Sequence, residues 1–306
     1  MTPLRIIFMG TPEFAVPCLE MLVEQKLNVV AVITAPDKPQ GRGQKLVPSP
    51  VKEAALKHNL PILQPTNLKA PAFIEELKSY QANLQIVVAF RMLPEVVWAM
   101  PSLGTFNLHA SLLPQYRGAA PINWAIINGE TETGVTTFFL KHEIDTGSII
   151  FQEKESIHES DTIGTLYERL MHKGAKLVLK TVKAIEAGDY PSLPQHSIEE
   201  IKHAPKIFKE TCEINWNQSA KKVVDFVRGL SPYPGAWTAL NGKLYKILRC
   251  EKSIVDDNQT MVDVGHWTID RGLKIKVIDG WVNVLEFQPE GKKRMLVEEF
   301  LRGNKI

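Results

Sequence analysis

The 306-residue sequence contains few cysteines, and their spacing fits neither a disulfide framework nor a zinc knuckle. There are three cysteines, an odd number, and no two of them form a CxxC pair; they are Cys18, Cys212 and Cys250. We therefore expect no structural disulfide and no metal site, as is typical of proteins in a reducing cytoplasm.

Long apolar runs are also missing. The apolar stretch Ile6–Gly10 is broken by Thr11 and Pro12, which makes it too short for the core of a signal peptide. Nothing later in the sequence approaches the length of a membrane span. We expect no membrane association and a cytoplasmic protein.

The sequence lacks the glycine-rich fingerprint of dinucleotide-binding proteins. After the first expected strand it has only Gly10, followed by Thr11, Pro12 and Glu13. A pyrophosphate-binding turn needs several glycines so that backbone amides can approach the ligand, and Glu13 would bring a negative charge there. This pattern disfavours a nicotinamide-dependent oxidoreductase.

The sequence has no large excess of charge of one sign, because positive and negative residues nearly balance to a net charge of +2. Residues 205–306 contain 17 Lys and Arg against 13 Asp and Glu, and the remainder contains 19 against 21. A mildly basic C-terminal third gives weak support for a polyanionic partner, although an ordinary solvated surface would look similar.

The first half of the sequence alternates short apolar strands with amphipathic helices. We expect strands at 4–9, 28–34, 84–90 and 104–109, a loop at 35–48 and a long helix over about 161–187. Thr11 is expected to cap the first helix, and Ser49-Pro50 to open the second. The pattern predicts an α/β fold, with a Rossmann-like, mostly parallel sheet and helices on both faces.

The second half changes character. A polar, proline-bearing stretch at 190–205 is expected to be a linker between a catalytic domain at 1–189 and a C-terminal domain at 206–306. In the latter we expect one helix at 219–229 and strands at 237–240, 243–248, 273–277 and 281–286. Short strands at such spacing predict a small, OB-like β-barrel.

Polar residues gather where the strand at 104–109 ends. Asn107 and His109 lie two residues apart, so strand alternation places both on one face, at the edge where open parallel sheets bind ligands. A further acid, Asp145, stands in an Asp-Thr-Gly sequence. His109 could instead be a hydrogen-bonded structural residue, and Asp145 a turn residue. An aspartic protease is disfavoured because it needs two such carboxylates.

These residues match the signature of folate-dependent formyltransferases. The match comprises Asn107, His109, the Ser111–Pro114 stretch, Gly118 and Asp145. The chain resembles the branch of that family that formylates methionyl-tRNA over nearly its whole length, in segments 9–17, 36–43, 117–122, 214–216, 232–237, 291–295 and 300–303.

The resemblance implies transfer of a formyl group from 10-formyltetrahydrofolate, as a co-substrate, to the α-amino group of initiator methionyl-tRNA, for translation initiation, without a metal. Asn107 would donate to the formyl oxygen, His109 would stabilise the tetrahedral oxygen and pass protons, and Asp145 would orient His109. Two alternatives remain: a formyltransferase for a sugar nucleotide or purine-pathway amine, and a non-catalytic RNA-binding protein on an enzyme fold.

The resemblance also implies binding residues. The folate side would be lined by Ser111, Leu112, Leu113, Pro114, Phe90, Met92 and Leu93. The sequence departs from the family pattern at Arg91 and Asn83, which leaves the folate contacts there open.

For tRNA, the resemblance implies basic side chains in the 35–48 loop and the C-terminal domain, which would contact phosphates. They are Lys38, Arg42, Lys45, Lys221, Lys222, Arg228, Lys243 and Lys246, followed by the run Lys292–Arg294. The loop could equally be an ordinary solvated one. We expect the protein to act as a monomer.

Overall fold

The computed structural model describes residues 3–40, 43–195, 200–240, 242–254, 262–269 and 272–303. Its contacts divide the chain into two compact units. Unit 1 comprises 1–117, 134–155 and 167–203, and unit 2 comprises 118–133, 156–166 and 204–306. No helix in the described ranges is both long enough and apolar enough to cross a bilayer.

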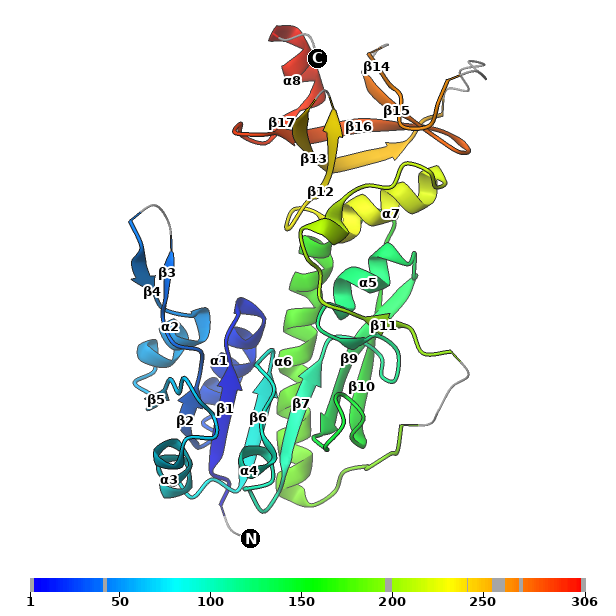
Figure 1. Cartoon of the computed structure of the whole chain (residues 1–306). Helices are drawn as coiled ribbons and strands as arrows, with labels where there is room; N and C mark the ends of the chain where they lie inside the picture. The colour runs from blue at the N-terminus through cyan, green and yellow to red at the C-terminus, as the bar shows by residue number, and fades with distance from the viewer. Residues whose placement is uncertain are drawn as a thin grey trace. The chain divides into compact units, whose positions relative to one another are not determined.

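A seven-stranded sheet, in the order β10-β9-β7-β6-β1-β2-β5, organises the first half of the chain (Figure 1). Five neighbouring strands run parallel: β1 (Ile6–Gly10), β2 (Val29–Ile33), β5 (Ile62–Leu63), β6 (Leu84–Val88) and β7 (Thr105–His109). The next strand, β9 (Glu132–Phe139), pairs antiparallel with β7, and β10 (Ile149–Ser156) lies beyond it at one edge of the sheet. The predicted Rossmann-like, mostly parallel sheet is confirmed.

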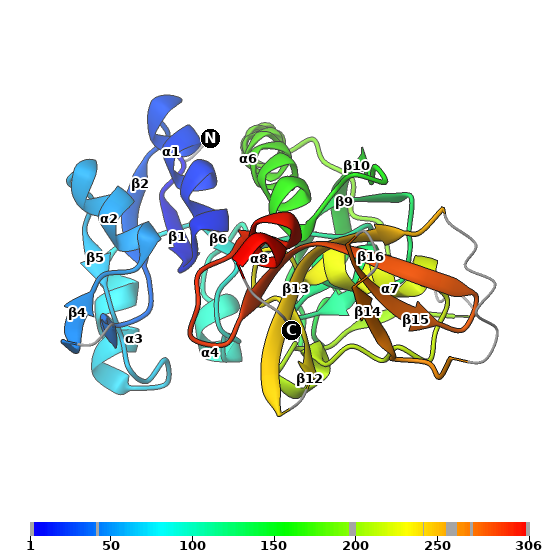
Figure 2. The same ribbon diagram turned by 90° about the horizontal axis from the view of Figure 1, so that it is seen from above.

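Helices cover both faces of this sheet (Figure 2). On one face, α3 (Pro71–Ser79) and α4 (Glu95–Trp98) pack Leu77 and Val97 against Ile7 of β1. On the other side lie α1 (Val16–Glu24) and the long α6 (Ile163–Ala187), which contacts the strand that carries Asn107 and His109. A Cβ atom on Gly174 of α6 would lie only 2.7 Å from the Leu108 side chain. The helix therefore packs closely on β7.

Two local predictions near the first turns were wrong. Thr11 does not cap a helix, because the chain first forms a 3-10 turn, η1 (Glu13–Ala15), and α1 starts at Val16. The 35–48 stretch is not an irregular loop, because β3 (Lys38–Gln40) and β4 (Lys45–Val47) pair as an antiparallel hairpin. The start of α2 (Pro50–Lys57) was predicted correctly: the Ser49 hydroxyl accepts the Lys52 N–H at 3.1 Å.

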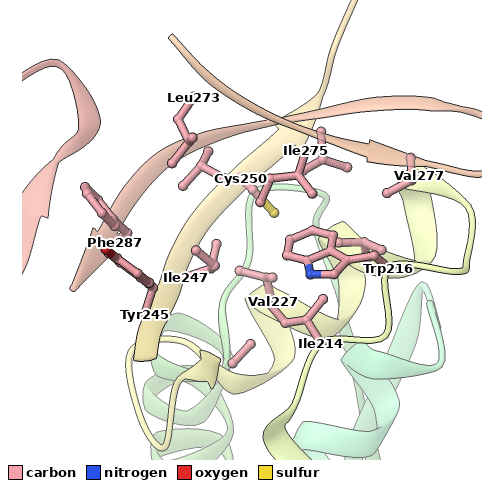
Figure 3. Packing of buried hydrophobic residues seen from close by; sticks show 14 of the residues in the cluster. Ile214, Trp216, Val227, Tyr245, Ile247, Cys250, Leu273, Ile275, Val277 and Phe287 are labelled. Atoms are coloured by element: carbon pink, nitrogen blue, oxygen red, sulfur yellow. The ribbon is translucent and has the colours of Figure 1, made fainter. Parts of the chain in front are cut away.

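Unit 2 is built on an antiparallel sheet that curls over a helix, α7 (Ala220–Leu230). Val227 of α7 packs among Ile247, Ile275 and Phe287 of the sheet, with Trp216 beside them (Figure 3). The predicted C-terminal β domain is confirmed as a half-barrel, and strands β14 and β17 are additions to the prediction. The strands are β12 (Ala236–Leu240), β13 (Lys243–Lys252), β14 (Trp267–Ile269), β15 (Leu273–Val277), β16 (Gly280–Pro289) and β17 (Met295–Leu296).

The remaining elements are short. They are β8 (Arg117–Gly118), α5 (Pro121–Ile127), β11 (His203–Ala204), η2 (Glu210–Cys212) and α8 (Val297–Gly303). All three cysteines are buried and free. Burial raises the pKa of the Cys18 thiol to about 12, so this thiol is protonated at neutral pH.

Candidate active site

The carboxyl end of β7 presents two polar side chains on one face. Leu108 faces α6, so Asn107 and His109 point to the opposite face, as the alternation of the strand requires. The His109 residue is 7% exposed, whereas Asn107 is partly exposed. Within the described residues the Asn107 amide forms no hydrogen bond with the protein, so its N–H groups are available to a ligand.

The imidazole of His109 is oriented by one neighbour on each nitrogen. Nε2 lies 2.8 Å from the carbonyl oxygen of Tyr116 and donates to it. Nδ1 lies 3.8 Å from Oδ2 of Asp145, whose side chain is 13% exposed. That separation exceeds a hydrogen bond but brings a carboxylate next to a buried ring. Both neighbours are hydrogen-bond acceptors, so together they favour one orientation of the ring.

Asp145 belongs to a tight turn between β9 and β10. Its backbone φ is +55°, and the Thr146 hydroxyl donates to the Glu143 carbonyl at 3.0 Å. A Cβ atom at Gly147 would lie 1.5 Å from the Phe139 carbonyl oxygen, so only glycine fits there. Asp145 is thus a turn residue and also the acidic neighbour of His109.

The Ser111–Pro114 stretch follows β7, and hydrogen bonds fix its backbone. The Ser111 hydroxyl donates to the Gln115 carbonyl at 2.6 Å, which is a turn interaction. The buried Thr136 hydroxyl donates to the Ser111 carbonyl at 2.6 Å and accepts the Leu113 N–H at 3.2 Å. Gln152 donates to the Leu113 carbonyl at 2.9 Å. The stretch therefore has a fixed backbone next to His109.

The side chains of the segment after β6 lie in different surroundings. The side chain of Leu93 belongs to the core, and Met92 is 72% exposed. Arg91 donates to the carbonyls of Thr66, at 3.0 Å, and Pro65, and its guanidinium carbon lies 5.7 Å from the centre of the Phe90 ring. The departure from the family pattern at Arg91 is therefore accommodated by a side chain bonded to residues 65–66.

The second departure from the family pattern, Asn83, lies at the amino ends of the strands, opposite the end that carries His109. Asn83 precedes β6, accepts the Arg5 N–H at 2.8 Å and donates to the Pro3 carbonyl at 3.0 Å. These bonds join the starts of two parallel strands, whereas His109 lies where its strand ends. Asn83 is thus a structural residue.

The basic residues of the predicted tRNA set differ in their surroundings. Lys38 and Lys45 are exposed on the two strands of the β3–β4 hairpin (Figure 1), and Arg42 lies outside the described residues. Lys222, Lys243 and Lys246 are also exposed. Lys221 pairs with Asp225 at 2.6 Å.

Arg228 is mostly buried, at 12% side-chain exposure. It contacts Asp225 at 2.9 Å and donates to the carbonyls of His158, at 3.1 Å, and Asp161, at 3.2 Å. The structure therefore gives it an internal role.

Sequence reasoning missed four groups that shape the site. The Tyr116 carbonyl is backbone and leaves no side-chain signal. Thr136 is a buried polar residue in the mostly apolar strand β9, and that contrast would have been its signal. Gln152 is an exposed residue of the polar half of β10 and leaves no such signal. Gln195 lies in the stretch expected to be a linker, and its side chain contacts the Asp145 turn.

Comparison with known proteins shows the family of this chain. The formyl transferase family model matches residues 4–182, and the formyl transferase C-terminal domain model matches residues 206–305. The methionyl-tRNA formyltransferase of Bacteroides fragilis is 55% identical over 98% of this chain and 95% of its own length. That of Phocaeicola vulgatus is 57% identical over 98% and 95%.

Solved structures share the fold at lower identity. An N-formyltransferase from Helicobacter canadensis, in complex with folinic acid and dTDP-3-aminofucose, is 20% identical, with a TM-score of 0.68 over 95% of this chain and all of its own. HypX from Aquifex aeolicus, in complex with tetrahydrofolic acid, is 19% identical, with a TM-score of 0.65, and the match covers 98% of this chain but 47% of HypX. On the two family models and on these relatives, the chain belongs to the formyl transferase family.

Proposed function

We propose that this chain transfers the formyl group of 10-formyltetrahydrofolate to the α-amino group of initiator methionyl-tRNA. The products are N-formylmethionyl-tRNA, used to initiate translation, and tetrahydrofolate. The observation that carries the choice of acceptor is the identity of 50–57% with methionyl-tRNA formyltransferases across both domains. The likeness to a sugar-nucleotide formyltransferase is a likeness of fold at 20% identity, and does not favour that acceptor.

The chemistry is acyl transfer between two nitrogens. The amine attacks the formyl carbon, a tetrahedral oxyanion forms, and the bond from that carbon to the folate nitrogen breaks. The attacking nitrogen loses a proton, and the departing nitrogen gains one. An α-amino group has a reference pKa of about 7.7–8.0, so an appreciable neutral fraction exists near pH 7 without strong activation.

Three side chains are assigned to these steps. Asn107 donates an amide N–H to the formyl oxygen, because its amide is partly exposed at the strand end. His109 stabilises the oxyanion and relays protons through Nδ1, because Nε2 is already bonded to the Tyr116 carbonyl whereas Nδ1 lies beyond hydrogen-bond distance of Asp145, at 3.8 Å. Asp145 favours the cationic ring and accepts a proton, directly after a closer approach or through one water molecule.

The folate co-substrate is assigned to the same edge of unit 1. Ser111–Pro114 is a rigid backbone next to His109, and the backbone at Phe90–Leu93 lines the end of β6. Met92 is exposed and Leu93 is in the core, so their assigned contribution is through backbone groups and the Met92 side chain.

The tRNA surface is assigned to the exposed basic residues. Lysine ammonium groups contact phosphates without base specificity, which suits a surface that must orient an acceptor stem. Arg228 is left out because its guanidinium bonds to unit 2 itself. The retained residues are Lys38, Lys45, Lys221, Lys222, Lys243, Lys246, Lys292 and Lys293, together with Arg42, which lies outside the described residues.

We also propose the catalytic domain at 1–189, the linker at 190–205 and the tRNA-binding domain at 206–306, acting as a monomer in the cytoplasm. The function is tested by supplying 10-formyltetrahydrofolate with charged initiator tRNA, free methionine or an amino-sugar nucleotide in parallel. We expect N-formylmethionyl-tRNA as the main product. Preferential formylation of the amino sugar would overturn the proposal.

A further inference from the structure

The carboxamide of Gln195 joins two segments of unit 1. Its Nε2 donates to the carbonyl oxygens of Asp145, at 2.7 Å, and Gly147, at 2.9 Å. Its Oε1 accepts from Arg117 Nε at 3.2 Å and Nη2 at 2.5 Å. Both ends of one amide are thus in use, the donor toward the Asp145 turn and the acceptor toward Arg117.

These two segments are the ones that orient His109. Arg117 directly follows Tyr116, whose carbonyl accepts from His109 Nε2. The Asp145 turn supplies the carboxylate next to His109 Nδ1. Gln195 therefore links the segment that bonds to His109 Nε2 with the turn that faces His109 Nδ1, and it does not contact the ring itself.

Gln195 is itself fixed in place. Leu193 exchanges two backbone hydrogen bonds with Ile149, at 2.8 and 2.9 Å, so this stretch runs along the start of β10. The Tyr190 ring lies 5.6 Å, between centroids, from that of Phe139. An amide on such an anchored segment can hold a neighbouring turn in one position.

We propose that Gln195 is a positioning residue, which aims the Asp145 carboxylate at His109 Nδ1. The proposal rests on the function proposed above. Only an amide serves both sides, since the carbonyls need a donor and the guanidinium needs an acceptor. A carboxylate at 195 would keep the Arg117 pair but lose both donors and repel the carbonyl oxygens of the turn.

The test is Gln195→Glu, with Gln195→Met as a second variant in case the first fails to fold. We expect kcat to fall by about 10²-fold, since a displacement of about 1 Å at a catalytic group can cost that much. We expect KM for both substrates to change less than twofold. The matched control is Gln81→Glu. Gln81 is exposed and precedes the start of β6, at the opposite end of the strands from His109, so this variant should keep the wild-type kcat.

A double-mutant cycle separates positioning from a general loss of stability. With Asp145→Asn already present, Gln195→Glu should lower kcat by less than threefold, because the carboxylate that it positions is gone. Fully multiplicative losses would overturn the proposal.

A crystal structure of Gln195→Glu gives an answer that does not depend on activity. We expect the distance from His109 Nδ1 to Asp145 Oδ2 to exceed 3.8 Å. An unchanged distance would refute the positioning role. If the wild-type chain proved inactive on methionyl-tRNA, the proposed function would fail, while this distance would still decide the role of Gln195.

Discussion

His109 presents Nδ1 to Oδ2 of Asp145 across 3.8 Å, which places a negative charge beside a buried imidazole. Asp145→Asn keeps the shape of the turn and removes that charge. We expect kcat to fall about 10²–10³-fold, the range seen for loss of one group that stabilises the transition state. Single-turnover formylation measures the loss. Glu143→Gln, an exposed acid of the same turn, is the control and should leave kcat unchanged.

The Thr136 hydroxyl fixes the Ser111–Pro114 stretch. Thr136→Val leaves the Ser111 carbonyl and the Leu113 N–H without their partner, so we expect a loss of about 1–3 kcal/mol in the free energy of unfolding. KM for the formyl donor should rise more than kcat falls. Urea denaturation and steady-state kinetics measure the two effects.

Thr133 on the same strand provides the control. Its buried hydroxyl has no hydrogen-bond partner among the described residues. Thr133→Val should therefore be neutral or stabilising. Equal destabilisation by the two substitutions would contradict the role given to Thr136.

Arg228 and Lys221 both pair with Asp225 but differ in burial. Arg228→Met removes the main partner of a buried carboxylate, for which we expect a cost of about 3–5 kcal/mol in unfolding free energy. Lys221 is 72% exposed, so Lys221→Met should cost about 0–1 kcal/mol. Chemical denaturation decides between this ranking and its reverse.

The exposed lysines should control the salt dependence of tRNA binding. Lys45→Gln or Lys243→Gln should each reduce the slope of log K against log salt by about 1 if the residue contacts one phosphate. Lys57→Gln is the control, because Lys57 pairs with Glu20 at 3.0 Å. If the affinity of the wild-type protein for tRNA did not change with ionic strength, the whole proposed basic surface would be contradicted.

Asp37 stands at the base of the β3–β4 hairpin. Hydrogen bonds from Lys52 and Gln64 hold the pKa of its carboxyl below the usual 3.8. A folded-state pKa below the unfolded value means that the ion pair stabilises the protein at neutral pH. This stabilisation decreases as the pH falls below 3.8 and through the lowered pKa. A carboxyl-carbon NMR titration should show a midpoint below 3.8 that Lys52→Met raises and Lys57→Met does not.

The central strands could be predicted from the sequence because β1, β2 and β6 are buried runs that contain β-branched residues. β7 is a mostly buried run with few β-branched residues, and its apolar Phe106 and Leu108 alternate with polar residues. Strands β14 and β17 could not be predicted from the sequence, because strands of three and two residues depend on pairing with distant neighbours. The β3–β4 hairpin was missed for a similar reason: Lys38–Gln40 and Lys45–Val47 have no apolar alternation.

The same contrast holds within the site. Alternation along β7 placed Asn107 and His109 on one face, and the family resemblance supplied Asp145. The Tyr116 carbonyl and the Gln195 amide could not be predicted, because what they do depends on tertiary contacts. Arg228 looked like a nucleic-acid contact in the sequence, and only its burial against Asp225 shows its internal role.

The bonds of Asn83 bear on how such a chain tolerates change. They tie down the amino ends of β1 and β6, and β6 is five residues long, or roughly 17 Å at the usual rise per residue. Swapping a neutral amide for an acid at this end of the sheet places the new charge a full strand length from the reacting atoms. Its effect on them is far weaker than that of Asp145, which lies 3.8 Å from the His109 ring, so the two ends of the sheet can diverge with little mutual constraint.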